Sequence, residues 1–284
     1  MNRRHQIALG LWVASLAVFG GALSRLVALA LQDTRYAHIL LVPFISAFLV
    51  RLRKQEILSQ ARYDPRAGAL VAVAGLGGLA AGFPNAGMLT AWIGTAVACY
   101  GLRTLKAAAF PAAFLALCIP PPSGAMDQLV VFLQKASADT TAGLLDLTGI
   151  AFQREEFRFS LNTVVIEVAE ECSGVRSFMS MLISAILAAH LLLRNGWNQV
   201  GFALLAIPVV ILKNAVRITG ITWLGVNVDQ GFFTGELHRY SGIPFSLVAV
   251  GILVPVLLAL RKLERAPLKI DALGVRHDQV VVNR

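Results

Sequence analysis

The most reactive side chain of this sequence is a cysteine, Cys172, at the point where a β-like segment meets an apolar helix. It stands in the sequence Glu-Glu-Cys-Ser-Gly-Val-Arg-Ser. At a helix N-terminus the backbone dipole and the free N–H groups favour a thiolate, and Arg176, one helical turn later, adds a positive charge. Glu170 and Glu171 oppose the thiolate if they point at the sulfur. The polar flanks disfavour the alternative of a buried structural cysteine, so we predict that Cys172 is functional.

A second group of candidate residues lies in Lys-Asn-Ala-Val-Arg-Ile, inside a long apolar stretch. An arginine within a membrane span is costly, which makes Arg217 a candidate functional residue. Lys213 and Arg217 are four residues apart and share one helix face, with Asn214 close to it. The alternatives for Arg217 are that it reaches the outer lipid headgroups or forms an ion pair with a glutamate next to Cys172.

The third candidate is His238, in Glu-Leu-His-Arg-Tyr-Ser-Gly just before the last apolar stretch. Histidine is the side chain best suited to move protons near neutral pH. A histidine in a loop is usually only solvated. The topology predicted below, however, brings Cys172, Arg217 and His238 to one face of the membrane, and this convergence favours a catalytic role.

The composition predicts an all-α polytopic membrane protein. Of the 284 residues, 57% are hydrophobic and only 14% are charged, whereas about a quarter are charged in soluble domains. The net charge of +9 comes from Lys and Arg in short loops between apolar stretches, which is typical of membrane orientation rather than of nucleic-acid binding. Three irregularly spaced cysteines form no zinc or disulfide pattern, and we predict no cofactor and no metal.

Apolar length, judged against a hydrocarbon core of about 30 Å, predicts about eight membrane helices. Their predicted ranges are 7–31, 38–52, 67–83, 87–102, 105–120, 172–193, 198–224 and 241–260. With the N-terminus inside, every strongly basic loop falls on the inner side. We therefore expect a multi-pass protein of the cytoplasmic (inner) membrane, in contact with the lipid bilayer and with its active site on the outer face.

One segment outside the membrane, about 120–171, is predicted on the outer side. Three prolines at its start end the preceding helix. Residues 126–147 then predict an amphipathic helix lying on the membrane surface. The alternative, a ninth span, would put Cys172 inside and break the charge pattern. Two alternating or β-branched stretches within 157–168 predict a short β-hairpin. We expect a single membrane domain over 1–264 and a cytoplasmic tail over 265–284.

Taken together, three motifs give the sequence a family resemblance: EECSGVRS around Cys172, KNAVRI around Arg217 and HRYSG around His238. In this order and spacing they resemble the exosortase/archaeosortase family of multipass membrane enzymes. The resemblance implies Cys172 as nucleophile, with Arg217 and His238 as catalytic partners. The implied substrates are exported proteins with a C-terminal signal made of a Pro-Glu-Pro-like (PEP-CTERM-like) motif, a transmembrane helix and a basic cluster. Such systems accompany the exopolysaccharide machinery of bacteria.

The physical chemistry of these residues fits a cysteine peptidase or transpeptidase. The Cys172 thiolate would attack a backbone carbonyl and form a thioester, Arg217 would stabilise the oxyanion, and His238 would move the proton. We assign Arg176 and Asn214 to substrate binding. Two alternatives stay open: a transporter or scaffold subunit for exopolysaccharide export, in which the cysteine is incidental, and a membrane endoprotease that uses water as acceptor.

Overall fold

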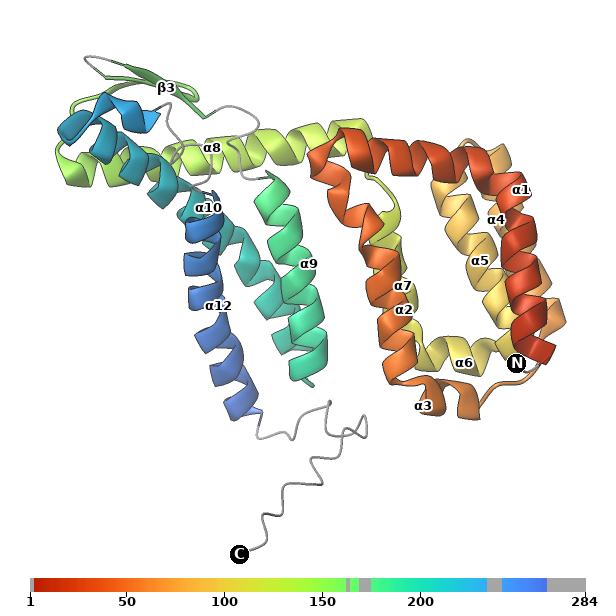
Figure 1. Cartoon of the computed structure of the whole chain (residues 1–284). Helices are drawn as coiled ribbons and strands as arrows, with labels where there is room; N and C mark the ends of the chain where they lie inside the picture. Colours follow the sequence, from red (N-terminus) through yellow and green to blue (C-terminus); the bar gives the residue numbers. More distant parts are fainter. Residues whose placement is uncertain (1–2, 162–163, 169–174, 234–241, 265–284) are drawn as a thin grey trace, which may run out of the picture. The chain divides into compact units, whose positions relative to one another are not determined.

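The computed structural model describes residues 3–161, 164–168, 175–233 and 242–264, and Figure 1 shows its elements. The chain divides into two compact units, Met1–Pro121 and Pro122–Arg284. The single membrane domain over 1–264 stays a prediction, and the predicted tail 265–284 lies outside the described residues.

The first unit is entirely helical. Its elements are α1 (Arg3–Gln32), η1 (Thr34–Leu40), α2 (Val42–Leu52), α3 (Lys54–Ser59), α4 (Pro65–Ala80), α5 (Pro84–Tyr100), α6 (Leu102–Ala107), α7 (Ala109–Phe114) and η2 (Leu115–Cys118). Local sequence explains several helix starts. Asp64 accepts the N–H of Ala67 and caps α4, whose first residue is Pro65. Proline has no N–H to lose at this position, so its fixed φ favours helix initiation there.

The helices α4 and α5 pack unusually close together because glycines line their contact. A Cβ atom added at Gly94 would lie 2.5 Å from the backbone nitrogen of Ala72, and one at Gly75 would lie 2.6 Å from that of Ala91. Small residues allow this close backbone approach between membrane helices. The Trp92 indole N–H of α5 in turn donates to Ser15 Oγ of α1 at 2.8 Å. The three helices thus form the core of the unit.

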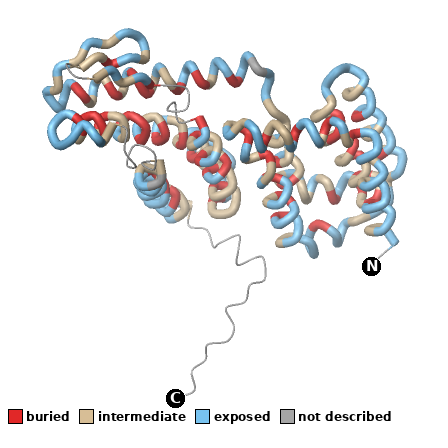
Figure 2. Tube along the Cα trace, turned by 45° about the horizontal axis from the view of Figure 1, so that its top comes forward, coloured by how far each residue is buried: buried red, intermediate tan, exposed pale blue. Residues whose placement is uncertain are grey.

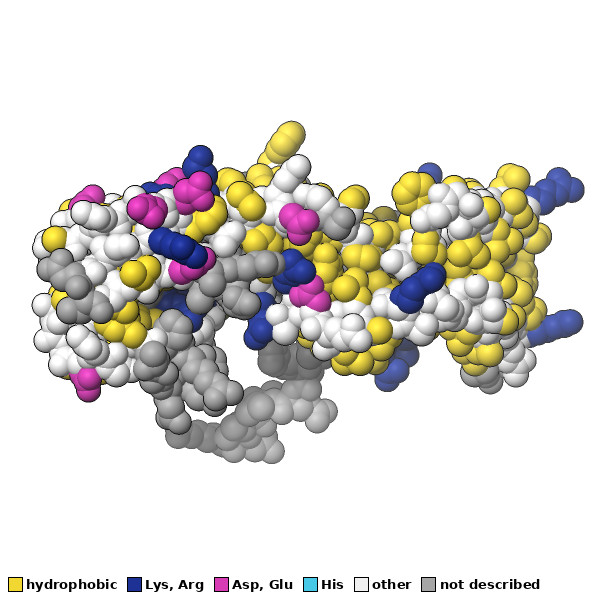
Figure 3. Space-filling view, turned by 90° about the horizontal axis from the view of Figure 1, so that it is seen from above, with side chains coloured by type: hydrophobic (Ala, Val, Ile, Leu, Met, Phe, Trp, Pro, Cys, Tyr) yellow, Lys and Arg dark blue, Asp and Glu magenta, His cyan; other side chains and the backbone are white. Residues whose placement is uncertain are grey.

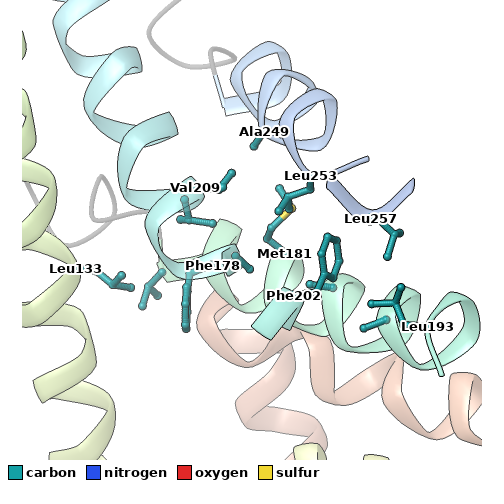
Figure 4. Close-up of a cluster of buried hydrophobic side chains, with 14 of the residues drawn as sticks. Leu133, Phe178, Met181, Leu193, Phe202, Val209, Ala249, Leu253 and Leu257 are labelled. Carbon is teal, nitrogen blue, oxygen red and sulfur yellow. The ribbon is translucent and has the colours of Figure 1, made fainter. Parts of the chain in front are cut away.

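The second unit combines four long helices with a small sheet. Its elements are α8 (Ser123–Thr148), β1 (Gln153–Glu155), β2 (Arg158–Ser160), β3 (Val165–Glu167), α9 (Val175–Leu192), α10 (Gly196–Asn227), η4 (Gln230–Phe233) and α12 (Gly242–Leu263). Its main apolar core lies between α8, α9, α10 and α12 (Figure 4). Leu133, Phe178, Phe202 and Leu253 are among its buried side chains.

The sheet is antiparallel, in the order β1-β2-β3. Phe159 pairs with Ile166 across β2 and β3 and with Arg154 across β1 and β2. The stretches expected as a hairpin thus lie in β2 and β3, whereas β1 was not expected. The buried side of the sheet packs Phe159 against Ala138 and Leu145 of α8. This contact occupies the apolar stripe of α8, the helix expected over 126–147.

The membrane spans agree with the all-α prediction in kind but not in number. Among the described residues, five helical stretches are long and apolar enough to cross a membrane: Arg3–Gln32, Thr34–Leu52, Val175–Leu192, Gly196–Asn227 and Pro244–Leu263. The helices α4 and α5, with 16 and 17 residues, are shorter than each of these five stretches. Figure 2 shows exposed residues along the outward faces of the long helices, and apolar side chains such as Val13 and Leu247 are among them. Eight spans are therefore not confirmed.

The predicted span 105–120 is not one continuous helix. The structure divides it between α6, α7 and η2. The break has a physical cause, because the ring of Pro111 clashes with the carbonyl of the residue four positions earlier, Ala107, and removes a helical hydrogen bond. The helix α6 ends at Ala107, and a new helix begins at Ala109.

Candidate functional site

The predicted site residues divide into two groups. Cys172 and His238 lie outside the described residues, in 169–174 and 234–241. Arg176, Asn214 and Arg217 are described, all within the second unit. The geometry of the site is therefore built from α9, α10, α12 and the sheet.

Arg217 lies in the second half of α10, next to a residue that contacts the sheet. It is partly buried. The adjacent Ile218 packs against the cluster formed by Phe159, Val168 and Leu145. The sheet and the end of α8 thus cover α10 at the level of Arg217.

The strand that leads toward Cys172 is firmly held at its last described residue. The Val168 side chain is 1% exposed. Its N–H donates to the Phe157 carbonyl at 2.9 Å, and its own carbonyl accepts from Gln134 Nε2 of α8 at 3.0 Å. Both backbone groups of Val168 are therefore bonded, which fixes the point from which the chain continues toward the cysteine.

Lys213, one turn before Arg217, is enclosed between helices. It is 5% exposed, and its Nζ donates to Ser246 Oγ of α12 at 3.4 Å. That distance is long for a hydrogen bond of an ammonium group. Ser246 Oγ in turn donates to the Gly242 carbonyl at 2.6 Å. The sequence placed Lys213 and Arg217 on one helix face, and the structure adds that the lysine end of this face meets α12.

Asn214 and Arg176, expected to bind substrate, have opposite surroundings. Asn214 is 1% exposed, whereas Arg176, in the first turn of α9, is exposed. The exposed guanidinium is accessible to a bound peptide. The substrate-binding role of both residues stays a prediction.

Three buried hydroxyl groups nearby were not singled out from the sequence. In the part of the chain that the structure describes, Ser137 and Thr141 of α8 and Thr219 of α10 have buried side-chain oxygens without a hydrogen-bond partner. Ser137 and Thr141 are one turn apart, on the apolar stripe of α8. Buried polar atoms normally have partners, so such groups are candidates to bond water or a ligand. The sequence feature that could have identified the α8 hydroxyls is the occurrence of polar residues within an otherwise apolar stripe of the helix.

Charged side chains are also present on the outer surface of the sheet and α8 (Figure 3). Arg154 Nη2 lies 2.6 Å from Asp139 Oδ1, and Arg158 Nε lies 3.0 Å from Glu167 Oε2. These pairs are exposed, so each contributes little to stability. Among the described residues, no three His, Cys, Asp or Glu side chains gather to hold a metal ion.

Comparison with known proteins identifies the family. The model of the transmembrane exosortase family matches residues 30–255. This range includes α10 with Arg217, as well as the segments with Cys172 and His238. No curated protein and no solved structure matches the chain. Because the family model covers most of the sequence, the chain belongs to the transmembrane exosortase family.

Proposed function

We propose that this protein is a membrane cysteine protease or transpeptidase that processes PEP-CTERM-like C-terminal sorting signals of exported proteins. The reaction takes place at the outer face of the cytoplasmic membrane. The observation that carries the proposal is the family match over 30–255, which contains all three motifs around Cys172, Arg217 and His238.

Chain connectivity supports a site in which Cys172 and Arg217 act together. Cys172 is four residues after Val168 and three residues before Val175. An extended chain covers at most about 3.6 Å per residue, so the cysteine lies within roughly 11 Å of the start of α9. Val175 is buried in the core that includes Val209 of α10, and Val168 lies in the cluster against which Ile218 packs. The Val168 end of the cysteine segment therefore borders the half of α10 that carries Arg217, and the Val175 end packs in the core that holds the first half of the same helix.

The proposed reaction has two steps. The Cys172 thiolate attacks the scissile carbonyl, a C–S bond forms, the C–N bond breaks, and His238 gives a proton to the leaving amine. Arg217, charged at all relevant pH values, stabilises the oxyanion of the tetrahedral intermediate. His238 then takes a proton from the incoming nucleophile, which attacks the thioester; the C–S bond breaks and the Cys172 thiolate is released, so that thiolate and protonated His238 are restored. An amine acceptor gives transfer, and water gives hydrolysis.

The test is co-expression with a tagged exported protein that carries such a signal, followed by mass analysis of the product. The wild type is expected to remove the signal helix, and Cys172→Ala is expected to remove none. Cys118→Ala, the same change at a half-buried cysteine of the first unit, is the matched control and should process normally. Full processing by an abundant Cys172→Ala protein would contradict the proposal. The mass of the new C-terminus distinguishes transfer from hydrolysis.

A second candidate function, a transporter or scaffold subunit for polysaccharide export, is favoured by one observation. Lys213 is buried in α10, and Arg217 follows one turn later. Two neighbouring cations inside a membrane helix could bind an anionic substrate. Under this function Cys172→Ser would leave activity unchanged, whereas the peptidase requires the thiolate.

A further inference from the structure

A cavity that is wide open to the surface, at one end of the first unit, is lined in part by two basic side chains. It has a volume of about 440 Å³ and is lined by Gln60, Arg103, Lys106 and Ala107. This volume is in the range of small-molecule sites. Its lining residues come from the end of α3 and from α6. These two helices contact each other and lie at the end of the unit that also holds the start of α1 (Figure 1).

The two cations of the cavity are available to a ligand. Arg103 and Lys106 are exposed and lie three residues apart on α6, which places them on the same side of the helix. Within the described residues, the side chain of neither takes part in an ion pair or a hydrogen bond. The nearest carboxylate on α3 is Glu56, and both of its oxygens accept hydrogen bonds from Arg53, at 2.9 and 2.5 Å. None of the described residues that line the cavity is acidic.

The backbone around the cavity is held by contacts between segments distant in sequence. The Arg62 N–H donates to the Tyr100 carbonyl at 3.0 Å, and Arg4 Nη1 donates to the Ala61 carbonyl at 2.7 Å. Gly101 has a φ of 85°, and a Cβ atom there would lie 2.7 Å from the Arg62 carbonyl oxygen. Only glycine fits this close approach. The linker after α3 is thus fixed to the turn before α6, and these two segments are next in the chain to Gln60 and Arg103 of the cavity.

The surroundings distinguish a lipid from a soluble anion. Leu102 is 45% exposed beside Arg103, and Leu58 is 37% exposed close to Gln60. These exposed apolar residues are close in sequence to residues that line the cavity, and a ligand with a charged head and apolar chains requires such a combination. The ends of α1, α2 and α4 meeting here are rich in Lys and Arg, which the positive-inside rule places at the cytoplasmic surface. Basic pockets between helices on that side bind anionic lipid headgroups.

We propose that this cavity binds the headgroup phosphate of an anionic glycerophospholipid of the inner leaflet. Arg103 and Lys106 bond the phosphate oxygens, the Gln60 amide contacts the polar part of the headgroup, and the acyl chains lie along Leu58 and Leu102. The guanidinium fork of arginine suits phosphate geometry. This site is separate in the chain from Cys172, Arg217 and His238, and the proposal does not depend on the proposed enzymatic function.

The experiment is a titration of the purified full chain in detergent with short-chain phosphatidylglycerol, followed by native mass spectrometry. Phosphatidylcholine of the same chain length and inorganic phosphate serve as comparison ligands. The double variant Arg103→Gln/Lys106→Gln is compared with Arg51→Gln/Lys54→Gln, which removes the same charge with the same spacing. The expected result is phosphatidylglycerol binding that falls about 30-fold in the first variant, from roughly 1 kcal/mol for each cation, and by less than about 3-fold in the control.

Three results would overturn the proposal. Equal losses in both double variants would mean that general basic charge, not this cavity, attracts the lipid. Equal binding of phosphatidylcholine and phosphatidylglycerol would exclude recognition of the anionic headgroup. Inorganic phosphate that binds as tightly as phosphatidylglycerol would identify a free-anion site, in which the acyl chains contribute nothing.

Discussion

Replacing the buried Lys213 by methionine should stabilise the protein and impair its function. The lysine is 5% exposed, and within the described residues its Nζ has one hydrogen bond, the 3.4 Å contact with Ser246 Oγ. Among the described residues no carboxylate pairs with it, and the like-charged Arg217 is one turn away. An unpaired buried ion costs several kcal/mol, and exchange of buried charges for apolar side chains of similar volume commonly stabilises proteins by about 1–4 kcal/mol. We expect a gain of about 1–3 kcal/mol for Lys213→Met, since the weak hydrogen bond is lost.

The assay is thermal unfolding in detergent, followed by tryptophan fluorescence. Each kcal/mol corresponds to a rise in Tm of roughly 2–4 °C in a chain of this size class. Lys262→Met is the matched control, because Lys262 is an exposed lysine near the end of α12, and its exchange should stay within about 0.5 kcal/mol. The same Lys213→Met protein should process the sorting signal more slowly, as expected where function retains a costly buried charge.

A lower Tm for Lys213→Met would refute this reasoning. It would show that the ammonium group has stronger partners than the Ser246 hydroxyl. A higher Tm together with unchanged processing would show that burial of the Lys213 charge destabilises the fold but that Lys213 has no role in the reaction.

Four further changes have defined outcomes. Arg217→Lys should reduce processing by at least about 100-fold, as loss of an oxyanion donor does; near-normal rates would exclude a role for the planar guanidinium. Gly94→Val should lower the thermal unfolding midpoint by several degrees, because backbone atoms of α4 lie within 3 Å of the new Cβ. Gly77→Ala should leave the midpoint unchanged, because no heavy atom lies within 4 Å of a Cβ added there. Glu264→Gln should destabilise the protein by about 1–3 kcal/mol, because hydrogen bonds to charged groups are the stronger ones. The Glu264 carboxylate accepts three hydrogen bonds from the loop before α10 and from the first turn of this helix. An unchanged denaturation midpoint would contradict this expectation. The hydrogen bond from the Arg35 side chain is the main cause that lowers the pKa of Asp33. The Asp33 carboxylate therefore stabilises the fold above its unfolded pKa, and this stability is lost as the pH falls through the lower folded pKa. Tm measured as a function of pH should fall on acidification in the wild type and fall less in Asp33→Asn.

The long helices could be predicted from the sequence because apolar length is a local property. The stretches 7–31 and 198–224 fall within α1 and α10. The stretch 38–52 was less accurate, since its first part is the 3-10 helix η1 and α2 begins only at Val42. Asp33 caps η1 through its carboxylate, and Pro43 lies in the first turn of α2. Hydropathy reports none of these details, because capping and proline geometry act at single residues.

The candidate site was less predictable because its geometry depends on contacts between distant elements. The spacing of Lys213 and Arg217 was sufficient to place them on one face of a helix. It could not show that Lys213 meets Ser246, which is 33 residues away, or that Ile218 packs against the sheet. The unpartnered hydroxyls of α8 were missed for the same reason, since an amphipathic pattern does not identify the partner of its buried face.

The periodicity of α10 explains how an apolar core positions polar groups. Seven residues of an α-helix turn through about 20° less than two full turns, so residues seven apart point in nearly the same direction. Ala206 is 0% exposed and Val210 is 1% exposed, both in the core shared with α9 and α12. Lys213 and Arg217 follow them at this spacing. The direction that is apolar in the first half of α10 therefore becomes cationic in the second half.

This relation also accounts for the contacts of α10 with α12. Lys213 bonds to Ser246, and the nearest atom to a Cβ added at Gly220, seven residues further, belongs to Phe245 at 3.8 Å. The stripe of α10 thus faces α12 at Lys213 and at Gly220. Because α10 runs without a break from Gly196 to Asn227, although it contains Pro208, the packing of its apolar half limits the rotation of its cationic half. The core of the second unit therefore does more than stabilise the fold, since it determines the direction in which Arg217 leaves α10.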